Sequence, residues 1–132
     1  MNRLAAWILT LSMVFAPHIA TAESLAYAEL QILDKVTTQK QNIQLVVGRA
    51  SVYGNLRLLP RRCDAYDVDS KSEAAAFLEI YDTKRGDGKK PIFSGWMFKS
   101  SPSLSSLEHA IYDVVLLGCS NNPSQAKSAS PQ

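Results

Sequence analysis

The sequence predicts a small all-β domain, either an antiparallel barrel or a sandwich of six or seven short strands, with at most one short helical turn. Short apolar runs alternate with glycine, proline and asparagine turn signals across residues 30–119. No segment there has the apolar spacing of an amphipathic helix. The chain has 132 residues, which is enough for one domain and too few for two after removal of a leader.

The first 22 residues predict export. Arg3 supplies a positive start, residues 4–16 form an apolar run, and the small residues 20–22 form a cleavage signal before Glu23. The apolar run is shorter than the ~20 residues that a membrane span needs. No cysteine follows the cleavage point, so a lipid anchor is not indicated. We expect a periplasmic or secreted protein that begins at Glu23 and has no transmembrane segment.

Charge and composition exclude several classes of function. The chain has 14 basic and 12 acidic residues, and loss of Arg3 with the leader brings the two closer still. This balance gives no electrostatic reason to expect a nucleic-acid partner. One histidine outside the leader and two cysteines cannot supply a zinc site. We therefore expect no metal and no cofactor.

The two cysteines, Cys63 and Cys119, are expected to form a structural disulfide, because an exported chain meets an oxidising environment. Two free thiols or an intermolecular bridge are the alternatives. The wide separation of the two residues in sequence argues against a redox-active pair of the Cys-x-x-Cys kind.

The first half of the domain is expected to hold four strands, at 30–36, 43–47, 50–53 and 56–63. A polar, turn-like segment at 37–42 separates the first two. Gly54 and Asn55 separate the last two. Pro60 predicts either an edge position or a bulge for the strand that contains it.

The second half is expected to hold three strands, at 77–82, 91–99 and 111–119. Residues 64–75 lack a clear pattern, and the alanine run at 74–76 suggests a helical turn there. Glycines and Asp87 predict a hairpin turn at 85–88.

The segments around the last strand have their own signals. The Ser/Pro-rich segment 100–106 is a loop that could hold one helical turn, with Leu104 and Leu107 on it. The strand at 111–119 is apolar on both faces apart from Asp113, which predicts a central position. Residues 120–132 have no aromatic or branched apolar side chain and are expected to form a disordered tail. The folded domain is thus expected to span residues 23–119.

The chain resembles a bacterial family catalogued as domain of unknown function 2155. The main match is FSGWMFKSSP at 93–102, followed by LEH at 107–109 and IYDV at 111–114. Three further segments fit the same pattern: LDKVT at 33–37, the strand from GNL at 54–56 to Cys63, and AAFLEI at 75–80. Ala110 departs from the pattern, which has proline after the histidine. The resemblance implies an exported bacterial envelope protein and brings no activity, ligand or catalytic residue.

An aromatic segment is the strongest sign of binding. On a strand, Trp96 and Phe98 share one face and Met97 lies on the other. Together with the following loop they predict a contact surface formed by Trp96, Phe98, Ser101, Leu104 and Tyr112. The alternative is that Trp96 and Phe98 pack under the 100–106 loop as part of the core.

His109 is the one histidine outside the leader. A hydrolase would need it beside a serine and an orienting acid, and the neighbouring candidates are Ser94, Ser100, Ser101, Glu108 and Asp113. No nucleophile elbow is present. The alternative is a structural histidine in a turn, hydrogen-bonded to a backbone carbonyl.

Two charge clusters remain. Asp64, Asp67 and Asp69 suit a solvated loop, with a calcium site as the alternative, although the spacing lacks the glycine and glutamate of an EF-hand. The segment 84–90 has four basic residues and suits a solubilising hairpin tip, with contact to anionic envelope polymers as the alternative.

We expect from these observations a non-enzymatic binding module for another envelope protein. A carbohydrate or peptidoglycan binder, with Trp96 or Tyr112 stacked on sugar rings, is the second hypothesis. A small hydrolase centred on His109 is the third.

Overall fold

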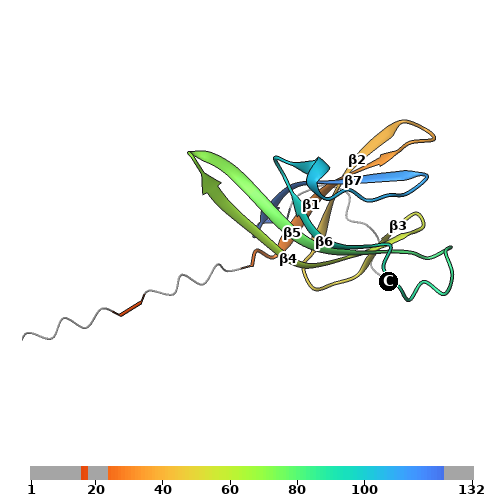
Figure 1. Cartoon of the computed structure of the whole chain (residues 1–132), viewed down its shortest axis with the longest axis horizontal. Helices are drawn as coiled ribbons and strands as arrows, with labels where there is room; N and C mark the ends of the chain where they lie inside the picture. The colour runs from red at the N-terminus through yellow and green to blue at the C-terminus, as the bar shows by residue number, and fades with distance from the viewer. Residues whose placement is uncertain (1–15, 18–23, 124–132) are drawn as a thin grey trace, which may run out of the picture.

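The computed structural model describes residues 16–17 and 24–123. The predicted leader lies outside the described residues except for positions 16 and 17, and so does the predicted tail after Pro123. The described chain forms seven strands and one 3-10 turn (Figure 1). The predicted all-β class is confirmed.

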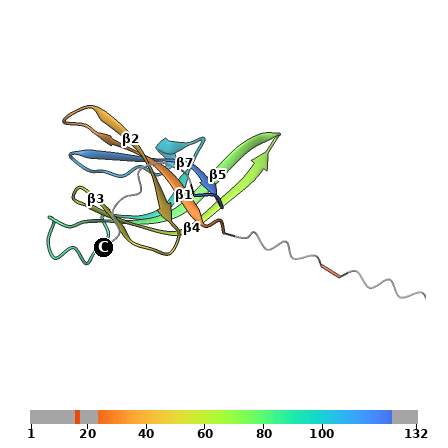
Figure 2. The same ribbon diagram turned by 180° about the vertical axis from the view of Figure 1, so that it is seen from behind.

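The strands form two antiparallel sheets. The three-stranded sheet has the order β2-β1-β7, built from β2 (Gln39–Val46), β1 (Tyr27–Asp34) and β7 (Tyr112–Ser120). The four-stranded sheet has the order β3-β4-β5-β6, built from β3 (Ser51–Tyr53), β4 (Leu56–Val68), β5 (Lys71–Asp82) and β6 (Phe93–Phe98). The sheets do not close into a barrel, so the architecture is a sandwich (Figures 1 and 2). The single helical turn, η1 (Pro102–Leu104), lies in the loop where it was expected.

Alternation along the strands builds one core between the sheets. In β1, Ala28, Leu30 and Ile32 are fully buried, and the residues between them are half-buried. In β5 the inward side chains are Ala76, Leu78 and Ile80, all at 0% exposure. Strand residues two apart share a face, so each sheet presents one apolar face to the other. Leu107 from the loop before β7 completes the core.

Residues 64–75 differ most from the prediction. They form the far ends of β4 and β5, which pair from Asp64↔Ala75 out to Val68↔Lys71. Asp69 and Ser70 both have positive φ, as a two-residue hairpin turn requires. The predicted helical turn at 74–76 is wrong, because Ala74 and Ala76 are inward-facing strand residues. Small side chains and an Asp-Ser turn gave a weak strand signal.

Some strand boundaries and one strand position also differ. The segment 37–42 is only partly a turn, since β2 begins at Gln39. Ser120 ends β7, one residue beyond the expected strand end, and the Asn121 side chain accepts a hydrogen bond from the backbone N–H of Ala26. The strand β7 lies at the edge of its sheet instead of its centre. Its inward residues Val114 and Leu116 are buried in the core between the sheets. The bulge predicted at Pro60 is present.

The disulfide between Cys63 and Cys119 links β4 to β7 and therefore joins the two sheets. Its Cα atoms are 5.6 Å apart, and the two residues are separated by 56 positions in sequence. Closing a loop of that length restricts the unfolded chain by about 4 kcal/mol in the chain-entropy account. In a domain of this size that is a large part of the total stability.

We expect Cys63→Ser/Cys119→Ser to lower the free energy of unfolding by about 2–4 kcal/mol, because the unfolded chain regains its freedom. Urea denaturation of the variant beside the oxidised wild-type protein measures the loss. The reduced wild-type protein serves as the matched control and should follow the variant. A loss below about 0.5 kcal/mol would contradict the importance given to this link.

Candidate functional site

The outward side chains of the four-stranded sheet form a surface of aromatic and charged residues, which we call the outer face. It is built by alternation, since along β5 each of its residues lies between two buried ones. On β5 the outward residues are Phe77, Glu79 and Tyr81, which are half-buried. On β6 they are Ser94, Trp96 and Phe98, beside the buried Met97.

Trp96 is the aromatic centre of the outer face. It lies opposite Phe77 in the β5–β6 register, and the two rings meet edge to face, with centroids 5.6 Å apart. Such a pair adds about 0.5–1.5 kcal/mol beyond burial and fixes the orientation of the indole. The Trp96 residue remains 38% exposed, so it is not fully covered by the 100–106 loop. The result is an apolar ring held in a fixed position at the surface.

A polar network lies on the same face, one and two strands away. Glu79 Oε2 accepts hydrogen bonds from Arg61 and from the Tyr81 hydroxyl, both at 3.0 Å. The hydrogen bond from Arg61 lowers the pKa of Glu79 most, and the hydrogen bond from Tyr81 lowers it further. The Arg57 guanidinium lies 4.3 Å from the centre of the Tyr81 ring. These groups are tied to one another and are therefore ordered before any ligand arrives.

The residues predicted to bind are only partly brought together. Trp96 and Phe98 share the outer face, as alternation required. Ser101 precedes η1 and is half-buried, and Leu104 on η1 is 72% exposed. Tyr112 lies elsewhere: its ring packs against Tyr53 and stacks on His109 at one end of the sandwich.

Tyr112 is held closely in that position. A side chain at Gly54 would collide with the Tyr112 hydroxyl. Gly54 also has a φ of +57°, a conformation that costs other residues energy. Tyr112 therefore packs inside the end of the sandwich, away from Trp96.

The sequence prediction missed the β4 and β5 residues of the outer face. Phe77, Glu79 and Tyr81 alternate with the apolar residues 78 and 80, which is the pattern of a half-exposed strand. That signal was available. What the sequence could not give was the neighbour relation, because the pairing of β5 with both β4 and β6 sets which side chains meet.

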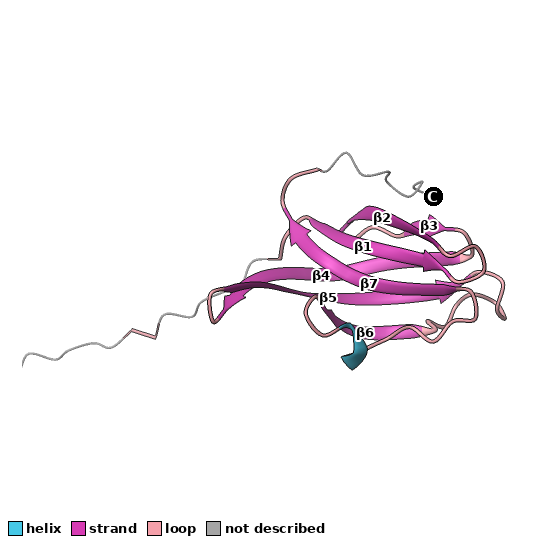
Figure 3. Cartoon of the chain, turned by 90° about the horizontal axis from the view of Figure 1, so that it is seen from above, coloured by secondary structure: helices cyan, strands magenta, loops and turns pink. Residues whose placement is uncertain are grey.

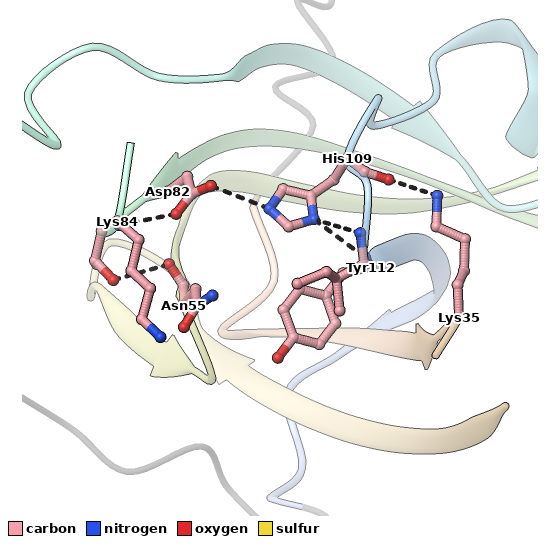
Figure 4. Close-up of polar contacts among 8 residues, drawn as sticks. Lys35, Asn55, Asp82, Lys84, His109 and Tyr112 are labelled. Carbon is pink, nitrogen blue, oxygen red and sulfur yellow. Dashed lines mark hydrogen bonds and ion pairs between the residues drawn. The ribbon is translucent and has the colours of Figure 1, made fainter. Parts of the chain in front are cut away.

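His109 lies in a closed hydrogen-bond network (Figure 4). Its Nδ1 accepts from the backbone N–H groups of Ile111 and Tyr112, both at 3.1 Å. Its Nε2 therefore carries the proton and donates to Asp82 Oδ2 at 3.1 Å. The side chains of His109 and Asp82 are only 5% and 7% exposed. The Lys35 ammonium donates to the backbone carbonyl of His109.

This network leaves His109 no free nitrogen for catalysis. A triad histidine must accept a proton from a nucleophile at one nitrogen while an acid orients the other. Here one nitrogen is held by an acid and the other by two backbone amides. The partner acid is Asp82, whereas Glu108 and Asp113 were the acids considered from the sequence. The geometry assigns His109 to holding the loop between β6 and β7 on the end of β5.

Asp82 is ionised in this network. Its Oδ1 accepts from the backbone N–H of Lys84 at 2.9 Å. That hydrogen bond, followed by the one from His109, lowers the pKa of Asp82, although burial acts in the opposite direction.

The two charge clusters lie at opposite ends of β5. Asp64 pairs with Arg62 at 2.7 Å, whereas Asp67 and Asp69 are exposed near the hairpin turn. Within residues 24–123, no three histidine, cysteine or acidic side chains are grouped closely enough to hold a metal ion. The basic residues of 84–90 lie in the exposed loop after the other end of β5.

In the part of the chain that the structure describes, no helix has the length and apolar character needed to cross a membrane.

These features define a small all-β sandwich with one disulfide and an ordered aromatic outer face. The chain belongs to the family described as "Uncharacterized protein conserved in bacteria (DUF2155)", whose model matches residues 28–119. It is also similar to "Uncharacterized protein RP359" of Rickettsia prowazekii (strain Madrid E), with 31% identity over 108 residues, covering 77% of this chain and 67% of that protein. No solved structure matches the chain. The family predicted from the sequence is confirmed.

We expect His109→Ala to lower the free energy of unfolding by about 2–4 kcal/mol, because the buried Asp82 carboxylate and two backbone amides lose their partner. Thermal and urea denaturation measure this loss. Glu108→Ala, at an exposed neighbouring position, is the matched control and should change little. A His109→Ala protein as stable as wild type would return His109 to the list of candidate catalytic residues.

We expect Asp82→Asn to reduce the loss of unfolding free energy that the wild-type protein shows as the pH falls. The folded pKa of Asp82 is lowered from its ordinary value of 3.8, so its contribution is fully present above about pH 4 and is lost as the pH falls through the lowered folded value. Urea midpoints measured between pH 2 and pH 7 test this. The difference between wild type and variant should shrink below about pH 4. A difference in stability between wild type and variant that is constant from pH 2 to pH 7 would contradict the stabilising role of the ionised Asp82 carboxylate.

Proposed function

We propose that this protein is a non-enzymatic binding module of the bacterial envelope, which binds another envelope protein through the outer face centred on Trp96. Export is part of the proposal, supported by the leader-like first 22 residues and by a disulfide that suits an oxidising compartment. The observation on which it depends is the 38% exposed indole of Trp96, fixed on a sheet face by Phe77.

The composition of the outer face supports a protein partner. Tryptophan, tyrosine and arginine are the residues most enriched among those that dominate binding energy at protein interfaces. Trp96, Tyr81 and Arg57 all lie on this face, and each is oriented by a neighbour. An ordered surface loses little side-chain entropy when it binds. The closed network around His109 supports the absence of an enzymatic role for that residue.

We expect a photo-crosslinking residue at Ser94, which is exposed beside Trp96, to capture one dominant protein in living cells. Trp96→Ala should reduce that adduct at least about tenfold, as loss of a central interface residue worth 2 kcal/mol or more implies. Its effect on stability should stay within about 2 kcal/mol, because only the ring pair with Phe77 and part of the indole burial are lost.

Two controls make the experiment specific. A crosslinker at Lys40, exposed on β2 in the other sheet, should not give the same adduct. Val36→Ala removes an exposed apolar side chain, 75% accessible, from the turn after β1 and should leave the adduct unchanged. An adduct from Ser94 that is unaffected by Trp96→Ala would contradict the proposed surface.

One observation favours a glycan as the second candidate partner. The Trp96 indole and the Arg61–Glu79–Tyr81 network lie on the same sheet face, and an aromatic ring beside ordered hydrogen-bonding groups suits a sugar. Retention of the purified protein on peptidoglycan sacculi, lost with Trp96→Ala, would favour this candidate. Retention that survives Trp96→Ala would count against it.

A further inference from the structure

The β4–β5 hairpin extends beyond the rest of the sandwich (Figures 1 and 3). Backbone pairing with β6 ends at Ala75↔Phe98, followed by a hydrogen bond from Lys99 N–H to the Ala74 carbonyl. Beyond it, the Ser100 backbone N–H donates to the Glu73 carboxylate at 3.1 Å. On the other side, the last backbone bond to β4 comes from Leu25 N–H to the Cys63 carbonyl. Among the described residues, 65–73 therefore form a ribbon of two strands only, which we call the arm.

Two apolar side chains of the arm are exposed to solvent. Tyr66 is 41% and Val68 is 49% exposed. In the register, Tyr66 lies opposite Glu73 and Val68 lies opposite Lys71, so all four share one face. Two-stranded ribbons are only marginally stable by themselves in water. A contact that covers this face would stabilise the arm.

A hollow of about 340 Å³ lies at the arm. Its lining combines an apolar wall with two carboxylates and one ammonium, from Val68, Asp69, Lys71, Ser72, Glu73 and Ser100. Such a site suits a lysine or arginine, whose methylene stem packs on apolar groups while its charge remains among polar ones. With the exposed Asp67 included, the arm has three acidic residues and one basic residue.

The opposite end of β5 has the complementary charge. The loop 83–92, which we call the basic loop, contains Lys84, Arg85, Lys89 and Lys90 against the single acid Asp87. All four cationic residues are exposed. The strand β5 has 12 residues and thus spans roughly 40 Å at about 3.4 Å per residue. The arm therefore cannot reach the basic loop of its own chain, although it can reach that of another.

We propose that the arm docks on the basic loop of a second copy of this chain, in a head-to-tail contact. Lysine or arginine stems of the loop pack on Tyr66 and Val68, and their charges face Asp69 and Glu73. Asp67, opposite Ser72 on the other face of the ribbon, adds to the negative charge of the arm. The surface formed by Tyr66 and Val68 lies on the same side of the four-stranded sheet as Trp96 but beyond the last residue pair of β6, Ala75↔Phe98. The contact is heterologous, so each pair keeps one free arm and one free basic loop. Association then rises with protein concentration and weakens with salt, since exposed charges are screened.

Sedimentation velocity of the purified protein tests this proposal. We expect self-association at 50 mM NaCl whose apparent Kd rises about tenfold or more at 500 mM NaCl. Asp67→Lys/Asp69→Lys and Lys89→Glu/Lys90→Glu should each be monomeric. An equimolar mixture of the two should associate again, because it contains both a native arm with a native basic loop and a reversed arm with a reversed loop. Lys40→Glu/Arg49→Glu changes the net charge as much as the loop variant does, at exposed sites elsewhere, and should behave as wild type.

An uncharged variant keeps the test independent of net charge. Tyr66→Ser/Val68→Ser should weaken self-association without changing its dependence on the basic loop. A wild-type protein that stays monomeric at 50 mM NaCl, or an association unaffected by either reversal, would overturn the proposal. A further outcome is a wild-type protein that stays monomeric while its arm binds a synthetic lysine-rich peptide. That result would overturn the proposal that a second copy occupies the arm, and would assign the arm to another basic protein. Trp96→Ala should leave self-association intact, so this test and that of the outer face fail separately.

Discussion

The position of β7 across the four-stranded sheet is the constraint on which the rest of the structure depends. At its C-terminal end β7 is joined to β4 by the Cys63–Cys119 disulfide. At its N-terminal end the residues before it are held by the buried hydrogen bond between His109 and Asp82. Between these two attachments, Val114 and Leu116 contribute to the common core. The two sheets thus share one core in a domain whose size leaves little reserve of stability.

That constraint separates the interior from the surface available for function. His109, whose imidazole suits acid–base catalysis on chemical grounds alone, is used to hold a loop. Tyr112 is used to fill the end of the sandwich against Gly54. The outer face is different, because its aromatic and charged groups are ordered by one another and remain accessible. Its side chains are thus both held in place and accessible to a partner.

Much of the fold could be predicted from the sequence, because alternation and turn residues are local signals. The strands around Ile32, Leu58 and Val114 and the turn at Gly54 follow from such signals, and the disulfide followed from the presence of two cysteines in a chain expected to be exported. The far half of the β4–β5 hairpin could not be predicted, since its alanines and its Asp-Ser turn resemble a loop. The outer face was only half predicted: Trp96 and Phe98 come from one strand, whereas Phe77, Glu79 and Arg61 join them through strand pairing. The partner of His109 was missed for the same reason, because Asp82 is 27 residues away in sequence.

The central claim is that the outer face is covered in the cell. Hydroxyl-radical footprinting in living cells, compared with the purified protein, tests it most directly, because an exposed indole is modified readily. The account predicts that Trp96 is modified several-fold more slowly in cells than in the purified protein. Leu104, exposed outside the outer face on η1, should be modified equally in both. Equal modification of Trp96 in the two samples would contradict the account.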